Sequence, residues 1–189
     1  MIDNVKVESL ANPRFLEPLR IFYSEDGVDK SWEMVKTSDS VAVLIYNCDQ
    51  KSFAFVKQFR PAVFLRNNDG FTYELCAGIL DKNKSEEQTA IEEIEEETGY
   101  KVSDDRLEKI ASFYSAVGVS GSRQTLFFAK VRDKDRVSSG GGVDTEKIEV
   151  AHIPRASVAE FIFDESLVKT AGLAFAVSWF LERERKKNA

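Results

Sequence analysis

The chain is 189 residues long and 43% hydrophobic, which suits one well-packed domain with a modest extension and is too little for two full-sized domains. Its net charge of −6 comes without any basic cluster, which argues against a nucleic acid partner because binding a phosphate backbone needs concentrated Lys and Arg. No segment approaches the ~20 apolar residues of a membrane span, the start lacks a secretory signal, and the two cysteines have no metal-ligand spacing. We therefore expect a cytoplasmic protein that binds neither nucleic acid nor membrane.

The first predicted elements are short strands. Residues 19–23 and 30–36 both have strand-like composition, and a polar turn joins them. Trp32 lies on the second strand, where an aromatic side chain taken alone is more typical of packing than of base stacking.

A second pair of strands follows. The apolar runs 41–46 and 53–60 predict a hairpin that is buried on both faces at its centre. Arg60, at the exit of the second run, carries a planar fork of donors that suits either a phosphate or a surface carboxylate.

A strand over 71–76 leads to the most informative helix of the sequence. Ser85 and Gln88 have the spacing of a capping box, and Gly99 is the residue type that most easily adopts the left-handed conformation past a helix end. These signals predict a helix from 86 to 98.

Carboxylates crowd this helix. Glu93 is three residues from Glu96 and four from Glu97, and each like-charge pair at these spacings costs about 0.2–0.5 kcal/mol. A hard divalent cation such as Mg²⁺ would offset the repulsion, since it prefers oxygen ligands from one or two carboxylates, phosphate and water. A solvated acidic helix face is the alternative.

The remaining chain is predicted to contain strands over 110–114 and 123–131, joined by a Gly- and Ser-containing loop. Residues 138–142 have the composition of a flexible linker. They lead into an acidic segment, 143–150, that suits either a mobile lid carrying a catalytic base or a plain surface loop. Apolar residues at helical spacing predict a covering helix over 169–184.

The segment 77–100 resembles the Nudix box of the Nudix hydrolase family, whose pattern is Gly, five residues, Glu, seven residues, then Arg-Glu-apolar-any-Glu-Glu-any-Gly-apolar. With Gly78 as the first glycine, the later positions that match are Glu93, Ile94, Glu96, Glu97, Gly99 and Tyr100. Two positions depart, because Lys84 stands at the first Glu and Glu92 at the Arg. Glu86 or Glu87 could replace the early glutamate, whereas no local residue stands in for the arginine that helps to hold the glutamates in the family.

The resemblance implies an α/β protein with the Nudix fold, in which mixed β-sheets are sandwiched between helices, over residues 38–189. Residues 1–37 would form a small antiparallel β extension that mediates a homodimer and contributes to the base pocket. Further similarity, in segments such as 56–63, 121–125 and 177–181, is to the subgroup that cleaves ADP-ribose and nucleotide sugars, and within it to the animal uridine diphosphate glucose pyrophosphatases.

What the resemblance implies chemically is Mg²⁺-dependent hydrolysis of UDP-glucose to UMP and glucose 1-phosphate, with ADP-ribose as a second substrate and Mn²⁺ able to replace Mg²⁺. Because of the two departures, a catalytically weak module that only binds nucleotide sugars is the alternative. The residues implied are Ala77, Glu93 and Glu97 as metal ligands, Glu96 and Glu146 in catalysis with Glu149 as the second candidate for the base, and Trp32, Arg60 and Gly78 in substrate binding.

Overall fold

The architecture comes from a computed structural model that describes residues 2, 5–8, 12–13, 16–80, 83–143 and 145–187. The strands are β1 (Glu17–Glu25), β2 (Val28–Lys36), β3 (Ser40–Asn47), β4 (Ser52–Phe59), β5 (Phe71–Glu74), β6 (Cys76–Ile79), β7 (Leu107–Tyr114), β8 (Arg123–Val131) and β9 (Ile148–Pro154). The helices are α1 (Pro61–Asn67), α2 (Glu86–Glu93), η1 (Ile94–Thr98), η2 (Asp104–Arg106), η3 (Asp133–Asp135), α3 (Val158–Phe163) and α4 (Ala171–Lys187).

Within these described ranges, seven strands form one mixed sheet. The central order is β5-β4-β3-β8-β7, and β6 pairs with β3 while β9 pairs with β4. The neighbours β3 and β8 run parallel, and the other pairs of the sheet are antiparallel.

The predicted hairpin of β3 and β4 is present but pairs over a short length. Its register covers only Ile45 to Asn47 against Ser52 to Ala54. Farther along, β6 pairs with β3 and β9 pairs with β4. The predicted strand over 71–76 is accordingly split at Leu75, because β5 belongs to β4 and β6 belongs to β3.

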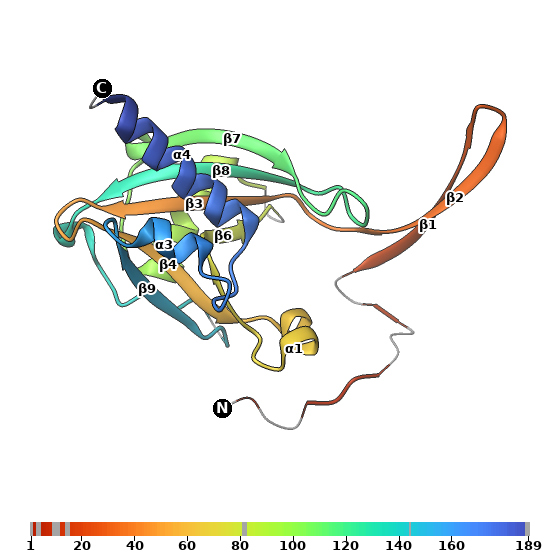
Figure 1. Ribbon diagram of the computed structural model, residues 1–189, viewed down its shortest axis with the longest axis horizontal. Coiled ribbons are helices and arrows are strands. Elements are labelled where there is room, and N and C mark those ends of the chain that lie inside the picture. Colours follow the sequence, from red (N-terminus) through yellow and green to blue (C-terminus); the bar gives the residue numbers. More distant parts are fainter. Residues whose placement is uncertain are drawn as a thin grey trace.

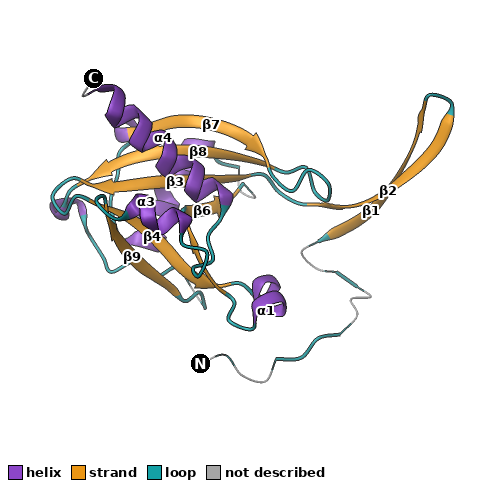
Figure 2. Cartoon of the chain, in the orientation of Figure 1, coloured by secondary structure: helices purple, strands orange, loops and turns teal. Residues whose placement is uncertain are grey.

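Helices cover both faces of the sheet (Figures 1 and 2). On one face, Ala90 and Ile94 of the acidic helix pack with Val41 and Val43 of β3. On the other, residues of α3 and α4 pack with alternate residues of the same strands. The continuous apolar run of β3 is thus buried on both sides, as predicted, and the α/β arrangement of a sheet between helices is confirmed. No helix in the described ranges is long and apolar enough to cross a bilayer.

The antiparallel hairpin of β1 and β2 forms a separate two-stranded sheet that projects away from the body (Figure 1). A backbone hydrogen bond from Val35 N to Val119 O, 2.8 Å long, links it to the loop between β7 and β8. Large apolar side chains are exposed along the hairpin, namely Leu19, Ile21, Phe22, Tyr23, Val28 and Trp32.

Candidate active site

The acidic helix begins as predicted. The Ser85 hydroxyl accepts a hydrogen bond from the backbone N–H of Gln88, and the Gln88 side chain accepts one from the backbone N–H of Ser85, each at 3.1 Å. The helix ends before Gly99, whose φ of 75° is left-handed, so the predicted range 86–98 is confirmed. Its last five residues wind as a π-helix, η1, which no local spacing in the sequence predicted. Such segments are frequent at functional sites.

Glu97, on this π-helix, is only 5% exposed. Its Oε2 accepts a 2.9 Å hydrogen bond from the backbone N–H of Ala77, and the Cys76 thiol also hydrogen-bonds to it. Burial, helped by the negative charges of Glu93 and Glu146, raises the pKa of Glu97 to about 7 although both hydrogen bonds oppose the shift. The carboxylate therefore occupies a dry, negative environment in which a bound cation would be stabilising.

Glu93 lies directly over Gly78. A Cβ atom added to Gly78 would be 2.1 Å from Glu93 Oε1, so only glycine permits this approach of helix and strand. The pKa of the buried Cys76 thiol is raised well above its usual value, first by burial and then by Glu97, Glu93 and Glu96. The charges of all three glutamates thus act on the buried thiol of β6, and Glu93 and Glu97 contact this strand directly.

Arg60 reaches the same region from the end of β4. Its Nε and Nη2 donate 2.8 Å hydrogen bonds to the two carboxylate oxygens of Glu74, which also accepts one from Thr72 Oγ1. The hydrogen bond to Glu74 is the main cause of the raised Arg60 pKa, and Glu97 and Glu146 contribute as well. Arg60 is thus held by Glu74, and the charges of Glu97 and Glu146 also act on it.

Glu74 was not predicted as a site residue. The signal that could have found it is the alternation of Thr72 and Glu74 in β5, which places two polar side chains on one face of an otherwise apolar strand.

The glycine-rich segment is a docked loop, and its prediction as a flexible linker was wrong. The N–H groups of Gly141 and Gly142 donate to the carbonyls of Glu97 and Glu96 at 2.9 and 3.1 Å. Helix ends leave such carbonyls without intrahelical partners, so the loop acts as their cap. A Cβ on Gly140, whose φ is +67°, would lie 2.4 Å from the Glu97 carbonyl oxygen, which explains the need for glycine.

This loop positions Glu146. The exposed Glu146 side chain accepts a 3.2 Å hydrogen bond from Val143 N, and its charge acts on both Glu97 and Arg60. Glu149, the second candidate for the base, lies on β9 opposite Lys57.

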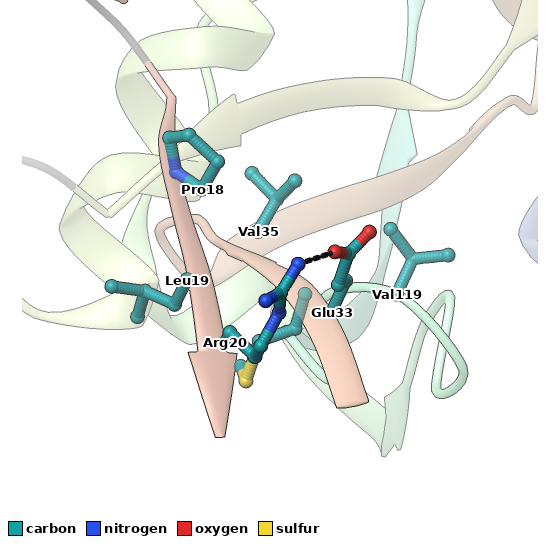
Figure 3. A pocket seen from close by; sticks show the side chains of 7 residues that line it. Pro18, Leu19, Arg20, Glu33, Val35 and Val119 are labelled. Carbon is teal, nitrogen blue, oxygen red and sulfur yellow. Dashed lines mark hydrogen bonds and ion pairs between the residues drawn. The ribbon is translucent and has the colours of Figure 1, made fainter. Parts of the chain in front are cut away.

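Trp32 is a predicted site residue that does not lie at the acidic helix of the same chain. It is 55% exposed on the projecting hairpin, and its indole Nε1 donates a 2.9 Å hydrogen bond to the Gly118 carbonyl. Near the foot of the hairpin, Arg20 and Glu33 form an ion pair beside Val119, around an open hollow of about 530 Å³ (Figure 3). Base stacking by Trp32 stays a prediction.

The donor set fits a hard divalent cation that is shared with a substrate. In the described residues, no three Asp, Glu, His or Cys side chains form a ready-made cage for an ion. Mg²⁺ does not need one, because it is usually bound by one or two carboxylates together with phosphate oxygens and water. Glu93 and Glu97, close to the backbone of β6, supply two such carboxylates.

Comparison with known proteins agrees with this geometry. The NUDIX domain family model matches residues 36–168. The uridine diphosphate glucose pyrophosphatase of Bos taurus is 38% identical over 95% of this chain and 94% of its own length, and that of Mus musculus is 36% identical over 96% and 95%. The GDP-mannose pyrophosphatase of Cronobacter sakazakii is 38% identical over 68% of this chain and 66% of its own. With the sheet between helices and the capped acidic helix, these matches show that the chain belongs to the Nudix hydrolase family.

Proposed function

We propose that this protein hydrolyses the pyrophosphate bond of nucleotide sugars, and that its main reaction converts UDP-glucose and water to UMP and glucose 1-phosphate. ADP-ribose is the second substrate. The observation that carries the proposal is the crowding of Glu93 and buried Glu97 against the Ala77–Gly78 backbone of β6. The relatives named for UDP-glucose and GDP-mannose support the substrate class.

Glu93, Glu97 and the carbonyl of Ala77 would hold Mg²⁺, which Mn²⁺ can replace. A divalent ion in such a site polarises phosphoryl oxygens and lowers the pKa of bound water. The absence of a side chain on Gly78 leaves room for the carboxylates beside the strand.

The other proposed site residues either accept a proton or balance charge during hydrolysis. The attacking water forms a new oxygen–phosphorus bond, the bridging phosphorus–oxygen bond breaks, and Glu146 accepts the proton of the water. Glu96, on the same turn as Glu97, adds to the negative field that holds the ion. Arg60 offsets the charge of the far phosphate, for which it must share its guanidinium with Glu74.

Residues 1–37 are proposed to mediate a homodimer and to bring Trp32 to the base of a nucleotide bound by the neighbouring copy. The exposed apolar side chains of the hairpin support this role, because contiguous apolar surface on a soluble protein usually marks an interaction site. The exposure of Trp32, away from the glutamates of its own chain, has the same explanation.

A turnover panel tests the proposal. UDP-glucose, ADP-ribose, GDP-mannose and a diadenosine polyphosphate are incubated with the protein and Mg²⁺, with Glu97→Gln as the control. Release of UMP from UDP-glucose that disappears in the variant is the expected result. Tight binding of UDP-glucose without release of UMP would overturn it and favour the nucleotide-sugar binding module, for which the departures at Lys84 and Glu92 are the specific argument.

A further inference from the structure

The two residues that depart from the Nudix box contact each other. Lys84 Nζ donates to both carboxylate oxygens of Glu92, at 2.6 and 2.5 Å. The family pattern has an acid at the first position and a base at the second, whereas this chain has a base first and an acid second. The two departures are therefore one exchange of charge between two positions that touch.

Glu86 does not compete for this contact. Glu86, which could have stood in for the early glutamate, is engaged elsewhere: Arg123 Nη2 lies 2.6 Å from its Oε1, and Lys109 Nζ 2.9 Å from its Oε2. These partners belong to β8 and β7.

The place of the pair in the fold connects it to the metal-binding glutamates. Lys84 immediately precedes the cap residue Ser85, and Glu92 immediately precedes Glu93. The pair thus ties the end of the loop that leaves β6 to the turn of helix that carries Glu93. Glu93, the next residue of the helix, lies over Gly78 of β6, so the Lys84–Glu92 contact stands directly beside the contact between helix and strand.

Charge supports the same role. Glu92 adjoins a helix segment that contains Glu93, Glu95, Glu96 and Glu97. Lys84 neutralises Glu92 at short range, so this carboxylate adds less to the repulsion among the metal ligands. Both side chains are partly exposed, at 36% and 41%, and an exposed pair of this kind tolerates exchange of its two ends because the Coulomb attraction does not depend on which end is positive.

We propose that Lys84 and Glu92 form a charge-inverted positioning pair that holds Glu93 and Glu97 in place for the ion and so keeps this Nudix box catalytically active. The inference rests on the proposed function and goes beyond it, because it assigns a role to the two residues that otherwise favour a degenerate box.

A charge-exchange cycle tests the pair. Lys84→Glu and Glu92→Arg each place like charges together, and the double variant restores an ion pair with the order of the family pattern. Each single variant is expected to lower kcat/KM for UDP-glucose about two- to fivefold and to raise the Mg²⁺ concentration for half-maximal activity. The double variant is expected to return both values to within about twofold of the wild type.

The matched control is the same exchange on the exposed pair Arg185 and Glu182 of α4, which lies on the opposite side of the sheet from α2. Glu182→Arg, Arg185→Glu and their combination are expected to leave the Mg²⁺ dependence unchanged. Single variants at 84 and 92 that behave like the wild type, or a double variant no better than the worse single one, would overturn the positioning role.

A second readout separates this proposal from the proposed function. The Mg²⁺-induced rise in Tm is measured for the same variants without substrate. If the wild type hydrolyses none of the panel, the proposed function fails, and the pair is then judged by this rise alone. It must shrink in each single variant and recover in the double variant.

Discussion

At the scale of single residues, the surroundings of Glu97 oppose a negative charge on its carboxylate in the metal-free protein. It is buried, it faces the charges of Glu93 and Glu146, and it is held by the Ala77 N–H. Burying a charge that lacks an opposite partner is costly, so ionised Glu97 lowers the free energy of unfolding of the metal-free protein. Binding residues often carry such a local cost because the ligand offsets it.

Glu97→Gln is therefore expected to stabilise the metal-free protein. The amide keeps an oxygen for the Ala77 N–H and removes the buried charge, and a gain of about 1 kcal/mol would raise Tm by roughly 2–4 °C. Thermal unfolding in EDTA measures this gain, and repeating it with Mg²⁺ shows whether the ion still stabilises the variant. An undiminished response to Mg²⁺ would contradict the assignment of Glu97 as a ligand.

Arg60 leads to a prediction about pH. Burial raises the pKa of Glu74, but the hydrogen bonds from Arg60 and Thr72 outweigh burial and leave the pKa below its usual value. Ionised Glu74 therefore stabilises the fold above its unfolded pKa, and this contribution is lost as pH falls through the folded pKa.

Arg60→Met removes the hydrogen bonds and the positive charge that lower the pKa of Glu74. Burial then raises this pKa, and the folded variant favours the protonated acid. We expect a loss of about 1–2 kcal/mol at pH 7 that shrinks toward pH 4, as measured by urea unfolding at both pH values. Arg132→Met, which breaks the exposed pair with Asp49, is the control and should cost less at pH 7. A loss that grows on acidification would show that Glu74 does not cause it.

At the scale of elements, the acidic helix and the glycine-rich loop form one unit. The loop donates to the last carbonyls of η1, and those carbonyls belong to Glu96 and Glu97. The position of Glu146 therefore depends on the same contacts that finish the helix. A change in the loop should consequently alter both stability and turnover.

Gly140→Ala tests this coupling. The new methyl group would meet the Glu97 carbonyl oxygen at 2.4 Å in a left-handed backbone, so we expect a loss of about 1–3 kcal/mol together with a lower kcat. Gly118→Ala is the matched control, because open space surrounds Gly118, and it should change both values little. The prediction fails if the two variants have equal stability and kcat.

At the scale of the whole molecule, contacts within a single chain do little to explain the stability of the hairpin of β1 and β2. Among the residues that the structure describes, its strands pair only with each other, hydrogen bonds to Val119 and Gly118 link it to the body, and its apolar side chains are exposed. Isolated two-stranded hairpins are marginally stable in water, so a second copy would provide the missing burial.

Ile21→Glu should therefore weaken the dimer. Ile21 is 50% exposed and pairs with Trp32 across the hairpin, so the new charge would lie among the apolar side chains that the proposed dimer buries. Sedimentation is expected to give twice the 21.3 kDa chain mass for the wild type and a shift toward monomer for the variant. Phe163→Glu, at an 80% exposed position of α3, is the control and should leave the mass unchanged. A monomeric wild type would contradict the dimer.

The sequence by itself predicted features that depend on short separations along the chain. The Ser85 cap, the end at Gly99 and the apolar run of β3 are encoded in residues a few positions apart, and all three were confirmed. Local backbone preferences and the 3.6- or two-residue periods determine such features, so no knowledge of distant partners is needed.

Only the tertiary structure decided which distant groups meet. The hydrogen bonds from Ala77 to Glu97, from Arg60 to Glu74 and from Gly141 to Glu97 cross between elements. The π-turn and the contact between Lys84 and Glu92 were likewise not predicted from local spacing in the sequence. Burial and charge depend on the complete set of neighbours in space, and that set exists only once the sheet has assembled.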